Sequence, residues 1–269
     1  MNATAFGQFQ PVAEKGWWRG MSNLLQGEYT AWFRTSRWWK HLLLWFSIIN
    51  VMMVLIIASA KATPGAENVP SPLLLYGIFG GMFVAFGVMI IMQGVLIREK
   101  QSGTAAWVLS KPVTRTAFVV SRLMINSIAI LLTSVIVPGA LFYVTLGLFS
   151  EMGWLSPFGY IAALLMISLH TFYWVALVLM TGTLFESSGG VIAVPMALFF
   201  TFWMGTSLFP GLIYISPLLL TFSPGQMNSL FSSFMTGEPV FSWLPLISTV
   251  VSSVIFIAIA IWRFNRQEF

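Results

Sequence analysis

The chain of 269 residues contains no cysteine and no aspartate, and it has only two histidines, His41 and His170. Without cysteine it can form neither a disulfide nor a thiolate metal site. No H-E-x-x-H motif is present, and Ser168 lies two residues from His170, a spacing that does not place both side chains on one helical face. We therefore expect no metal site, no catalytic residue and no enzymatic activity in this chain alone.

Charge is also scarce. Asp, Glu, Lys and Arg make up 8% of the residues, whereas 58% are hydrophobic and the mean hydropathy is +0.86. Soluble domains carry about 25% charged residues, so this composition excludes a soluble globular protein. Since about 20 apolar residues in a helix cross a bilayer core, the sequence predicts an all-α polytopic membrane protein with six transmembrane helices. The predicted spans are His41–Ala60, Leu73–Ile97, Phe118–Phe149, Phe158–Leu184, Gly190–Leu208 and Phe241–Trp262.

Prolines predict two irregular places in this layout. Pro138 lies inside the long third span, where we expect a kink or an extension beyond the bilayer. The apolar segment Pro210–Phe222 is short and is interrupted by Pro217. We expect it to form short helices before span six that are re-entrant or lie at the outer interface.

The basic residues predict the orientation. Every Lys and Arg except Lys61, which shares a loop with Glu67, falls on one side of the predicted membrane. Because short basic loops stay in the cytoplasm, we expect both termini there. The net charge of +5 then indicates anionic lipid headgroups or a peripheral protein as partner, and no nucleic acid. The opening residues lack the features of a signal peptide, so we expect the N-terminus to be retained.

No segment is long or polar enough to form a separate soluble domain, so we expect one transmembrane domain over residues 1–269. Within it, 17–40 is predicted to be an amphipathic helix, 98–116 a cytoplasmic loop and 208–240 an extracytoplasmic loop. The apolar positions that recur at helical spacing in the first of these are Met21, Leu24, Leu25, Tyr29, Trp32 and Phe33. This helix is either a general membrane-surface anchor or an elbow helix that also braces a cytoplasmic partner.

A compact polar segment, REKQSGTAAWVLSKPVTR at residues 98–115, lies between the second and third spans. Gly103 permits a break, residues 104–110 can form a short helix, and Pro112 ends it. Its composition alone favours a charged, solvated loop. A rigid helix tied at both ends to membrane spans can instead transmit a push from a soluble partner into the membrane.

The order of residues in this segment resembles the E-x-x-x-G-T…L-x-S-[RK]-P-[VI]-[ST]-R pattern of permeases of the ABC transporter type-2 (exporter) family. The six-span layout, the helix before the first span and the loop before the sixth are also similar to that family. The resemblance implies that residues 98–116 are the coupling helix and its flanks, which dock on a separate ATP-binding subunit. The residues carried over to this role are Glu99, Ser102, Gly103, Thr104, Ser110, Lys111, Pro112 and Arg115.

The resemblance also implies that two permeases, identical or paralogous, associate with two ATP-binding subunits. This chain has no G-x-x-x-x-G-K-[ST] phosphate loop, so we expect no cofactor in it and expect ATP and Mg in the partner subunit. The loop between spans four and five, Phe185–Gly190, is very short. For that reason we do not expect a second cytoplasmic contact through Glu186.

Several polar residues lie inside the predicted spans. Asn50, Gln93, Asn126, His170 and Tyr173 either line a translocation path or satisfy one another between helices, and packing is the favoured interpretation. The candidates for the path are Gln93, Asn126, His170 and Tyr173. In span two, Gly77 and Gly81 form a G-x-x-x-G pair that permits close helix approach.

Together, these features predict the permease subunit of an ATP-driven exporter of an amphipathic or lipophilic substrate in a prokaryotic plasma membrane. The alternative is an ion-gradient-driven secondary carrier, which needs a titratable group inside a span. His170 is the only candidate for that role. The sequence leaves open the identity of the cargo and whether the two permeases are identical.

Overall fold

In the computed structural model, which describes residues 14–62, 71–223 and 228–268, six helices are long and apolar enough to cross a membrane. They cover Arg37–Ala62, Pro72–Gln101, Arg115–Phe149, Pro157–Leu184, Ser188–Leu208 and Leu244–Asn265. The described residues contain no strand. The prediction of an all-α protein with six spans is confirmed. The loop residue Glu67 lies outside the described residues.

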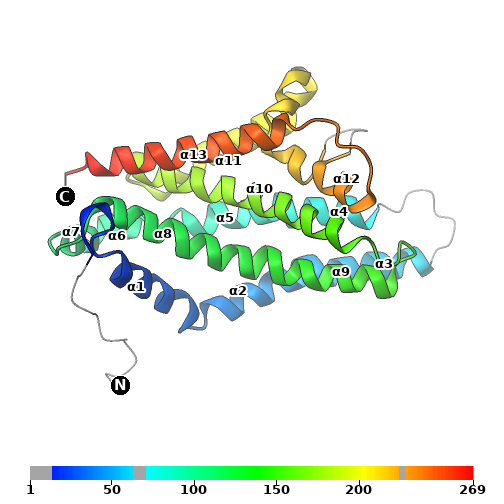
Figure 1. Cartoon of the computed structure of the whole chain (residues 1–269), viewed down its shortest axis with the longest axis horizontal. Coiled ribbons are helices and arrows are strands. Elements are labelled where there is room, and N and C mark those ends of the chain that lie inside the picture. Colours follow the sequence, from blue (N-terminus) through cyan, green and yellow to red (C-terminus); the bar gives the residue numbers. More distant parts are fainter. Residues whose placement is uncertain (1–13, 63–70, 224–227, 269) are drawn as a thin grey trace.

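Each of the first three spans is built from several helical pieces. The first contains α2 (Arg37–Phe46), η3 (Ser47–Val51) and α3 (Met52–Ala62); the second contains α4 (Pro72–Gly77), η4 (Ile78–Phe83), α5 (Val84–Met92) and α6 (Ile97–Gln101); the third contains α8 (Arg115–Ile130), η5 (Leu131–Ile136) and α9 (Val137–Phe149). The last three spans are single helices, α10 (Pro157–Leu184), α11 (Ser188–Leu208) and α13 (Leu244–Asn265). Figure 1 shows all six running along the long axis of the molecule.

The middle pieces η3, η4 and η5 are π-helical turns. In the third span, η5 ends two residues before Pro138, and the helix then continues to Phe149. Proline lacks an N–H group and its ring crowds the carbonyl of the preceding turn, so a wider turn there keeps the helix continuous. The irregularity that Pro138 predicted therefore takes the form of a π turn just before it.

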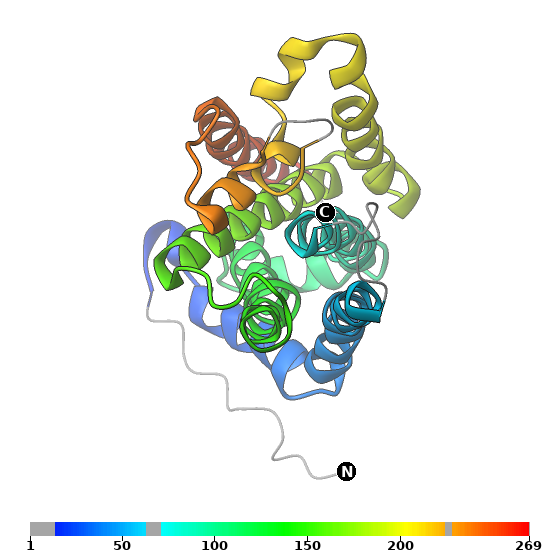
Figure 2. The ribbon, with the colours of Figure 1, turned by 90° about the vertical axis from the view of Figure 1, so that its right-hand side faces the viewer.

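The central element of the bundle is α10, which packs against α5, α8, α11, α12 and α13. In the most apolar 18-residue stretch of α10, 56% of the residues are buried, whereas the corresponding stretches of α11 and α13 each have 22% of their residues buried. The outer spans thus leave most of their apolar surface for lipid or for another protein chain. Figure 2 shows span two lying between span one and α11 on one side of the bundle.

Before the first span, a 3-10 turn η2 (Gly16–Trp18) leads into α1 (Met21–Phe33), which packs against α8. The prediction of one helix over 17–40 is wrong in its extent. The chain breaks at residues 34–36, and α2 starts the first span at Arg37. The run of polar residues Arg34, Thr35 and Ser36 explains the break, because hydroxyl side chains compete for backbone hydrogen bonds; Thr35 Oγ1 donates to the Ala31 carbonyl at 2.9 Å.

Before the sixth span, η6 (Pro210–Tyr214), η7 (Pro217–Leu220) and α12 (Leu230–Thr236) form short helical pieces. All four residues of η7 are buried. Thr221, which follows η7, packs directly on Gly77 and Gly81 of span two, where a Cβ atom at either glycine would collide with it. The G-x-x-x-G pair therefore receives this segment of the same chain.

Candidate functional site

One end of the bundle gathers basic residues. We call it the basic end, and it comprises the 98–116 connection, the turn at 185–187 and the end of α13 (Figure 1). There α6 continues span two to Gln101, Gly103 adopts a left-handed φ of +71°, and α7 (Thr104–Leu109) follows. Because residues with a Cβ rarely adopt this backbone conformation, Gly103 allows the chain to change direction between α6 and α7.

Short side-chain hydrogen bonds lie at both ends of α7. Ser102 Oγ and Thr104 Oγ1 lie 2.8 Å apart at its start, and Ser110 Oγ donates to the Trp107 carbonyl at 2.7 Å at its end. Pro112 follows two residues later and prevents continuation of the helix. Thr114 Oγ1 then accepts the Ala117 N–H at 3.2 Å and begins α8. The last two residues of the predicted loop, Arg115 and Thr116, therefore belong to span three.

The connection is also fastened to distant parts of the chain. Thr114 donates its N–H to the Arg19 carbonyl at 3.1 Å and its hydroxyl to the Trp17 carbonyl at 2.6 Å. Arg115 Nη1 donates to the Asn265 carbonyl at the end of α13, at 2.6 Å. The short helix α7 is thus part of a connection that is bonded to the N-terminal segment and to the last span.

A largely buried cluster of charges lies between α1, α6 and α8. Arg122 of α8 forms two parallel hydrogen bonds to the Glu99 carboxylate, from Nε to Oε2 at 3.1 Å and from Nη2 to Oε1 at 2.9 Å. Its Nε lies 3.6 Å from Oε1 of Glu28 on α1. The Arg122 side chain is only 5% exposed, and its guanidinium lies 3.5 Å from the centre of the Phe118 ring. One arginine therefore joins the end of span two, span three and α1.

The two carboxylates of this cluster have different environments. Burial raises the pKa of Glu28 above its ordinary value, while the Arg122 guanidinium opposes that shift and the charge of Glu99 adds to it. Arg122 is thus shared by two acids, of which Glu99 has the shorter contacts. The folded protein holds a proton on Glu28 more tightly than an unfolded chain would.

A second polar contact joins α1 to α8 at the same level. The Trp32 indole Nε1 donates to Asn126 Oδ1 at 2.8 Å, and Asn126 Nδ2 donates to the Arg122 carbonyl at 2.8 Å. Trp32 is fully buried and Asn126 nearly so. The Asn126 side chain thus accepts one hydrogen bond from α1 and donates one within α8, which fixes α1 against span three.

The structure brings the predicted coupling residues together on the 98–116 connection. Gly103, Thr104 and Lys111 are exposed on the outer surface of the basic end. Glu99 instead points inward and anchors the connection through Arg122. Three more of the predicted coupling residues are exposed on the outer surface of the basic end: Ser102, Ser110 and Pro112. Arg115 is partly buried against the end of α13.

The four predicted path residues do not share one surface. Asn126 faces α1, whereas His170 lies fully buried, with Nδ1 2.9 Å from the Pro217 carbonyl oxygen and Nε2 accepting the Trp174 indole N–H at 3.0 Å. Tyr173 is buried against the rings of Trp174 and Phe256. Only Gln93 is incompletely buried, and its Nε2 donates to the Ile90 carbonyl at 3.1 Å.

Two important features of the basic end were missed from the sequence. Trp107 on α7 is 66% exposed and lies beside the charged residues of the 98–116 connection. Glu28 occupies the apolar face of α1, three and four residues beyond Leu25 and Leu24 and four before Trp32. That spacing was a readable signal that this carboxylate is buried, and a buried carboxylate requires a partner such as Arg122.

In the part of the chain that the structure describes, no three His, Cys, Asp or Glu side chains come close enough to hold a metal ion. The basic end presents ion pairs, hydrogen-bonding side chains and the exposed rings of Trp107 and Trp262. Such a surface can bind another macromolecule.

Comparison with known proteins covers almost the entire chain. The profile of a family described as ABC-2 family transporter protein matches residues 21–269. An uncharacterized transmembrane protein of Bacillus subtilis (strain 168), YxlG, is 26% identical over 206 residues, which cover 76% of this chain and 74% of that protein. The matched range includes α1, all six spans and the 98–116 connection.

Proposed function

The chain belongs to the ABC-2 family of transporter proteins, and we propose on that premise that it is the permease subunit of an ATP-driven exporter. It is a multi-pass membrane protein, and its own residues supply the membrane part of a transport machine. The hydrolysis of ATP, with Mg, belongs to a separate ATP-binding subunit. That subunit docks on the basic end, which lies in the cytoplasm of a prokaryotic cell together with both termini.

The observation that carries this proposal is the construction of the 98–116 connection. Trp107 on α7 is exposed, and Nζ of Lys111, two residues after the end of α7, lies 5.2 Å from the centre of the Trp107 ring. A large aromatic side chain beside a cation is a common anchor in protein interfaces. The surface of α7 is thus suited to a soluble partner, while its base is fixed to the membrane spans.

The Glu99–Arg122–Glu28 cluster supplies the mechanical link. A displacement of α7 by the ATP-binding subunit pulls on Glu99, and the bidentate contact passes the force to Arg122 in span three. Through Glu28 the same arginine reaches α1. Because α1 and spans two and three are joined at one buried point, the partner moves them together.

The cargo path in this proposal lies between two permease copies, identical or paralogous, each with its own ATP-binding subunit. We place this path on the side of the bundle where span two lies between span one and α11 (Figure 2). Leu74, Phe83 and Ile90 of span two are exposed, and Gln93 lies one turn from Ile90. An apolar surface with a single amide suits an amphipathic or lipophilic cargo.

The alternative of an ion-driven carrier gains no support from His170. Both of its ring nitrogens have hydrogen-bond partners, and the side chain is completely buried. A proton carrier needs a titratable group that alternately meets the two aqueous sides. The contacts of His170 instead fix η7 against α10.

The test is affinity purification of the chain from its native membrane in mild detergent, followed by identification of the copurified proteins and reconstitution into liposomes. We expect an ATP-binding subunit in the complex and cargo movement only when ATP is present. Transport by this chain alone under a pH gradient, with no nucleotide and no second protein, would overturn the proposal.

A further inference from the structure

The central helix α10 ends at the basic end without the glycine that commonly caps a helix. Its last residue is Leu184, and Phe185 follows in an extended conformation, with φ −107° and ψ 162°. The last carbonyl groups of a helix have no partner within it. Because Gly182 and Thr183 are buried, their carbonyl groups need partners from other parts of the chain.

Lys100 of α6 supplies the main partner. Its Nζ donates to the Gly182 carbonyl at 2.9 Å, and it lies 3.5 Å from the Thr183 carbonyl oxygen and 3.4 Å from that of Phe185. An ammonium group has three N–H donors, and its positive charge suits the negative end of a helix dipole. One side chain of span two therefore caps the end of span four.

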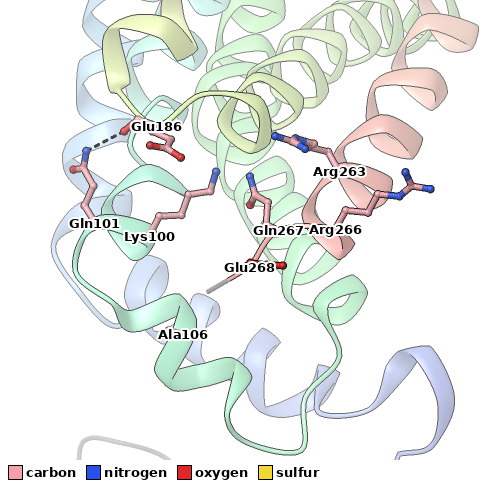
Figure 3. Close-up of a pocket in the computed structure, with 8 residues that line it drawn as sticks. All are labelled: Lys100, Gln101, Ala106, Glu186, Arg263, Arg266, Gln267 and Glu268. Carbon is pink, nitrogen blue, oxygen red and sulfur yellow. Dashed lines mark hydrogen bonds between the residues drawn. The ribbon is translucent and has the colours of Figure 1, made fainter.

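Two glutamines attach other elements at the same place. Gln101 Nε2 donates to the Glu186 carbonyl at 3.0 Å, and Gln267 Nε2 donates to the Thr183 carbonyl at 2.6 Å. Figure 3 shows Lys100 and Gln101 reaching from α6, and Gln267 from the residues after α13. Lys100 and Gln101 thus bind α6 to the end of α10, while Gln267 binds the last span to it.

The helix α6 is consequently held on two sides. Glu99 pairs with Arg122 of α8, whereas the next residue, Lys100, faces α10. Successive residues of a helix point about 100° apart, so α6 can bond to two spans at once. Since α10 packs against α5, α8, α11, α12 and α13, a displacement of α6 reaches the centre of the bundle by a route that does not pass through Arg122.

The alternative is that Lys100 is a surface cation available to an acidic group of a partner. Its contacts argue against this. The side chain is partly buried, its ammonium group is directed at backbone carbonyls, and no carboxylate of the described residues forms an ion pair with it within 4.0 Å. A lysine whose hydrogen bonds are made inside the chain is better suited to hold two helices together than to bind a partner.

We propose that Lys100 is a positioning residue for transport: it joins α6 to the end of α10, so that a displacement of α7 moves the central helix of the bundle. The inference rests on the proposed function above, because it needs a partner that moves α7. It adds a second route to the one through Arg122. At the far end of α10, Gly159 lies directly against the Phe234 carbonyl of α12, so the movement extends to α12.

A cysteine on α12 can report this movement without knowledge of the cargo. The chain has no cysteine of its own, so Ser232→Cys introduces a single thiol at the opposite end of the bundle from α7 (Figure 1). In the purified complex, the rate at which a maleimide labels this thiol is measured without nucleotide and after trapping with ATP, Mg and vanadate. We expect the two rates to differ when Lys100 is present.

The outcomes separate the two proposals. Equal labelling rates in a complex whose ATP-binding subunit is bound and hydrolyses ATP would overturn the role of Lys100 and leave the proposed function intact. Absence of any ATP-binding subunit from the complex would overturn both.

Substitutions of Lys100 test its part in the response. Lys100→Met removes the donors at similar length, and the difference between the two labelling rates should shrink about tenfold, because a charged hydrogen bond is lost. Lys100→Arg keeps a cation with N–H donors and should retain most of the difference. A general loosening of the bundle would instead raise both rates together. If Lys100→Met does not assemble, Lys100→Gln, which keeps N–H donors without the charge, should show a smaller loss.

Gln267→Leu is the matched control. It removes a bond to the same end of α10 without detaching α6, so the difference between the two labelling rates should remain. Each variant is first shown to elute with the ATP-binding subunit as a complex of unchanged size. A full difference in the Lys100→Met or Lys100→Gln variant, or an equal loss in Gln267→Leu, would overturn the proposal.

Discussion

At the scale of single residues, Arg122 has the largest structural role at the basic end. It is buried, it lies between two carboxylates, and its guanidinium covers the Phe118 ring. A buried charge without its partners is far more costly than a buried pair. The cluster is therefore a place where one substitution should affect the whole basic end.

Replacement of Arg122 by Met should destabilise the protein by about 3–5 kcal/mol, because Glu28 and Glu99 would face each other without a cation. Arg122→Lys keeps the charge but loses the bidentate geometry, and its cost should be smaller, about 1 kcal/mol. The measurement is thermal unfolding of the detergent-solubilised protein, followed by size-exclusion chromatography. Equal stability of the Met and Lys variants would contradict the role assigned to the ion pairs.

Glu28 gives a prediction on pH. Because burial raises the pKa of Glu28 in the folded protein, the folded state binds its proton more tightly than the unfolded state does. Stability should therefore fall as the pH rises from about 4.3, the ordinary value, through the raised value, and stay lower above it. Glu28→Gln removes this loss, so its melting temperature should match that of the wild type at low pH and exceed it at neutral pH.

The matched control for Glu28→Gln is Glu151→Gln, which alters an exposed carboxylate at the opposite end of the bundle. The difference between this control and the wild type should not change with pH. A constant difference for Glu28→Gln across the whole pH range would show that its carboxyl does not titrate differently on folding.

At the scale of elements, Gly103 decides how α6 leads into α7. An added Cβ would meet no atom within 4 Å, so the cost of Gly103→Ala comes only from its φ of +71°. We expect that cost to be about 1–2 kcal/mol, and we expect α7 to distort or fray as a result. The expected result is reduced stimulation of the partner's ATPase activity by cargo, with normal membrane insertion.

Gly27→Ala provides the comparison for Gly103→Ala. Gly27 lies inside α1, also with open space at the Cβ position, but with an ordinary helical backbone. There the substitution should stabilise the helix by about 0.5–1 kcal/mol. If both alanine variants couple ATP hydrolysis to transport as the wild type does, the geometry of α7 is not important for coupling.

The contact of the segment after η7 with span two supplies another prediction at this scale. A Cβ on Gly81 would collide with the Thr221 side chain, whereas a Cβ on Gly77 would collide with the Thr221 backbone carbonyl. Gly81→Ala and Gly77→Ala should each destabilise by about 1–3 kcal/mol. Thr221→Gly should restore stability only to Gly81→Ala, because it leaves the backbone in place. Rescue of both variants would show that the segment packs elsewhere.

At the scale of the whole molecule, the distribution of charge predicts how the bundle lies in the membrane. The basic end carries the 98–116 connection and the end of α13, and the opposite end carries Glu151 and Glu238. The rule that short basic loops remain in the cytoplasm then orients all six spans.

Labelling single cysteines with an impermeant maleimide checks this orientation in intact cells. Trp107→Cys should react only after the membrane is opened, whereas Glu151→Cys and Glu238→Cys should react without opening it. All three side chains are exposed, so access depends on the side of the membrane. Reaction of Trp107→Cys in intact cells would show that the orientation is the opposite one and would exclude a cytoplasmic partner on α7.

The sequence by itself determined the number of spans, their approximate ends and the short helix between spans two and three. These features depend on local properties: runs of apolar residues and the breaks at Gly103 and Pro112. Local hydrogen bonding and hydropathy act within a few residues, so they can be read directly along the chain.

Only the tertiary structure decided which side chains meet. Glu28 and Arg122, Trp32 and Asn126, or Gly81 and Thr221 are far apart in sequence, and each pair depends on how spans pack side by side. In a membrane protein both the buried and the lipid-facing sides of a helix are apolar, so hydropathy does not distinguish them. For the same reason the sequence could not show that Arg115 bonds to the end of α13, because that contact also depends on the packing of the spans.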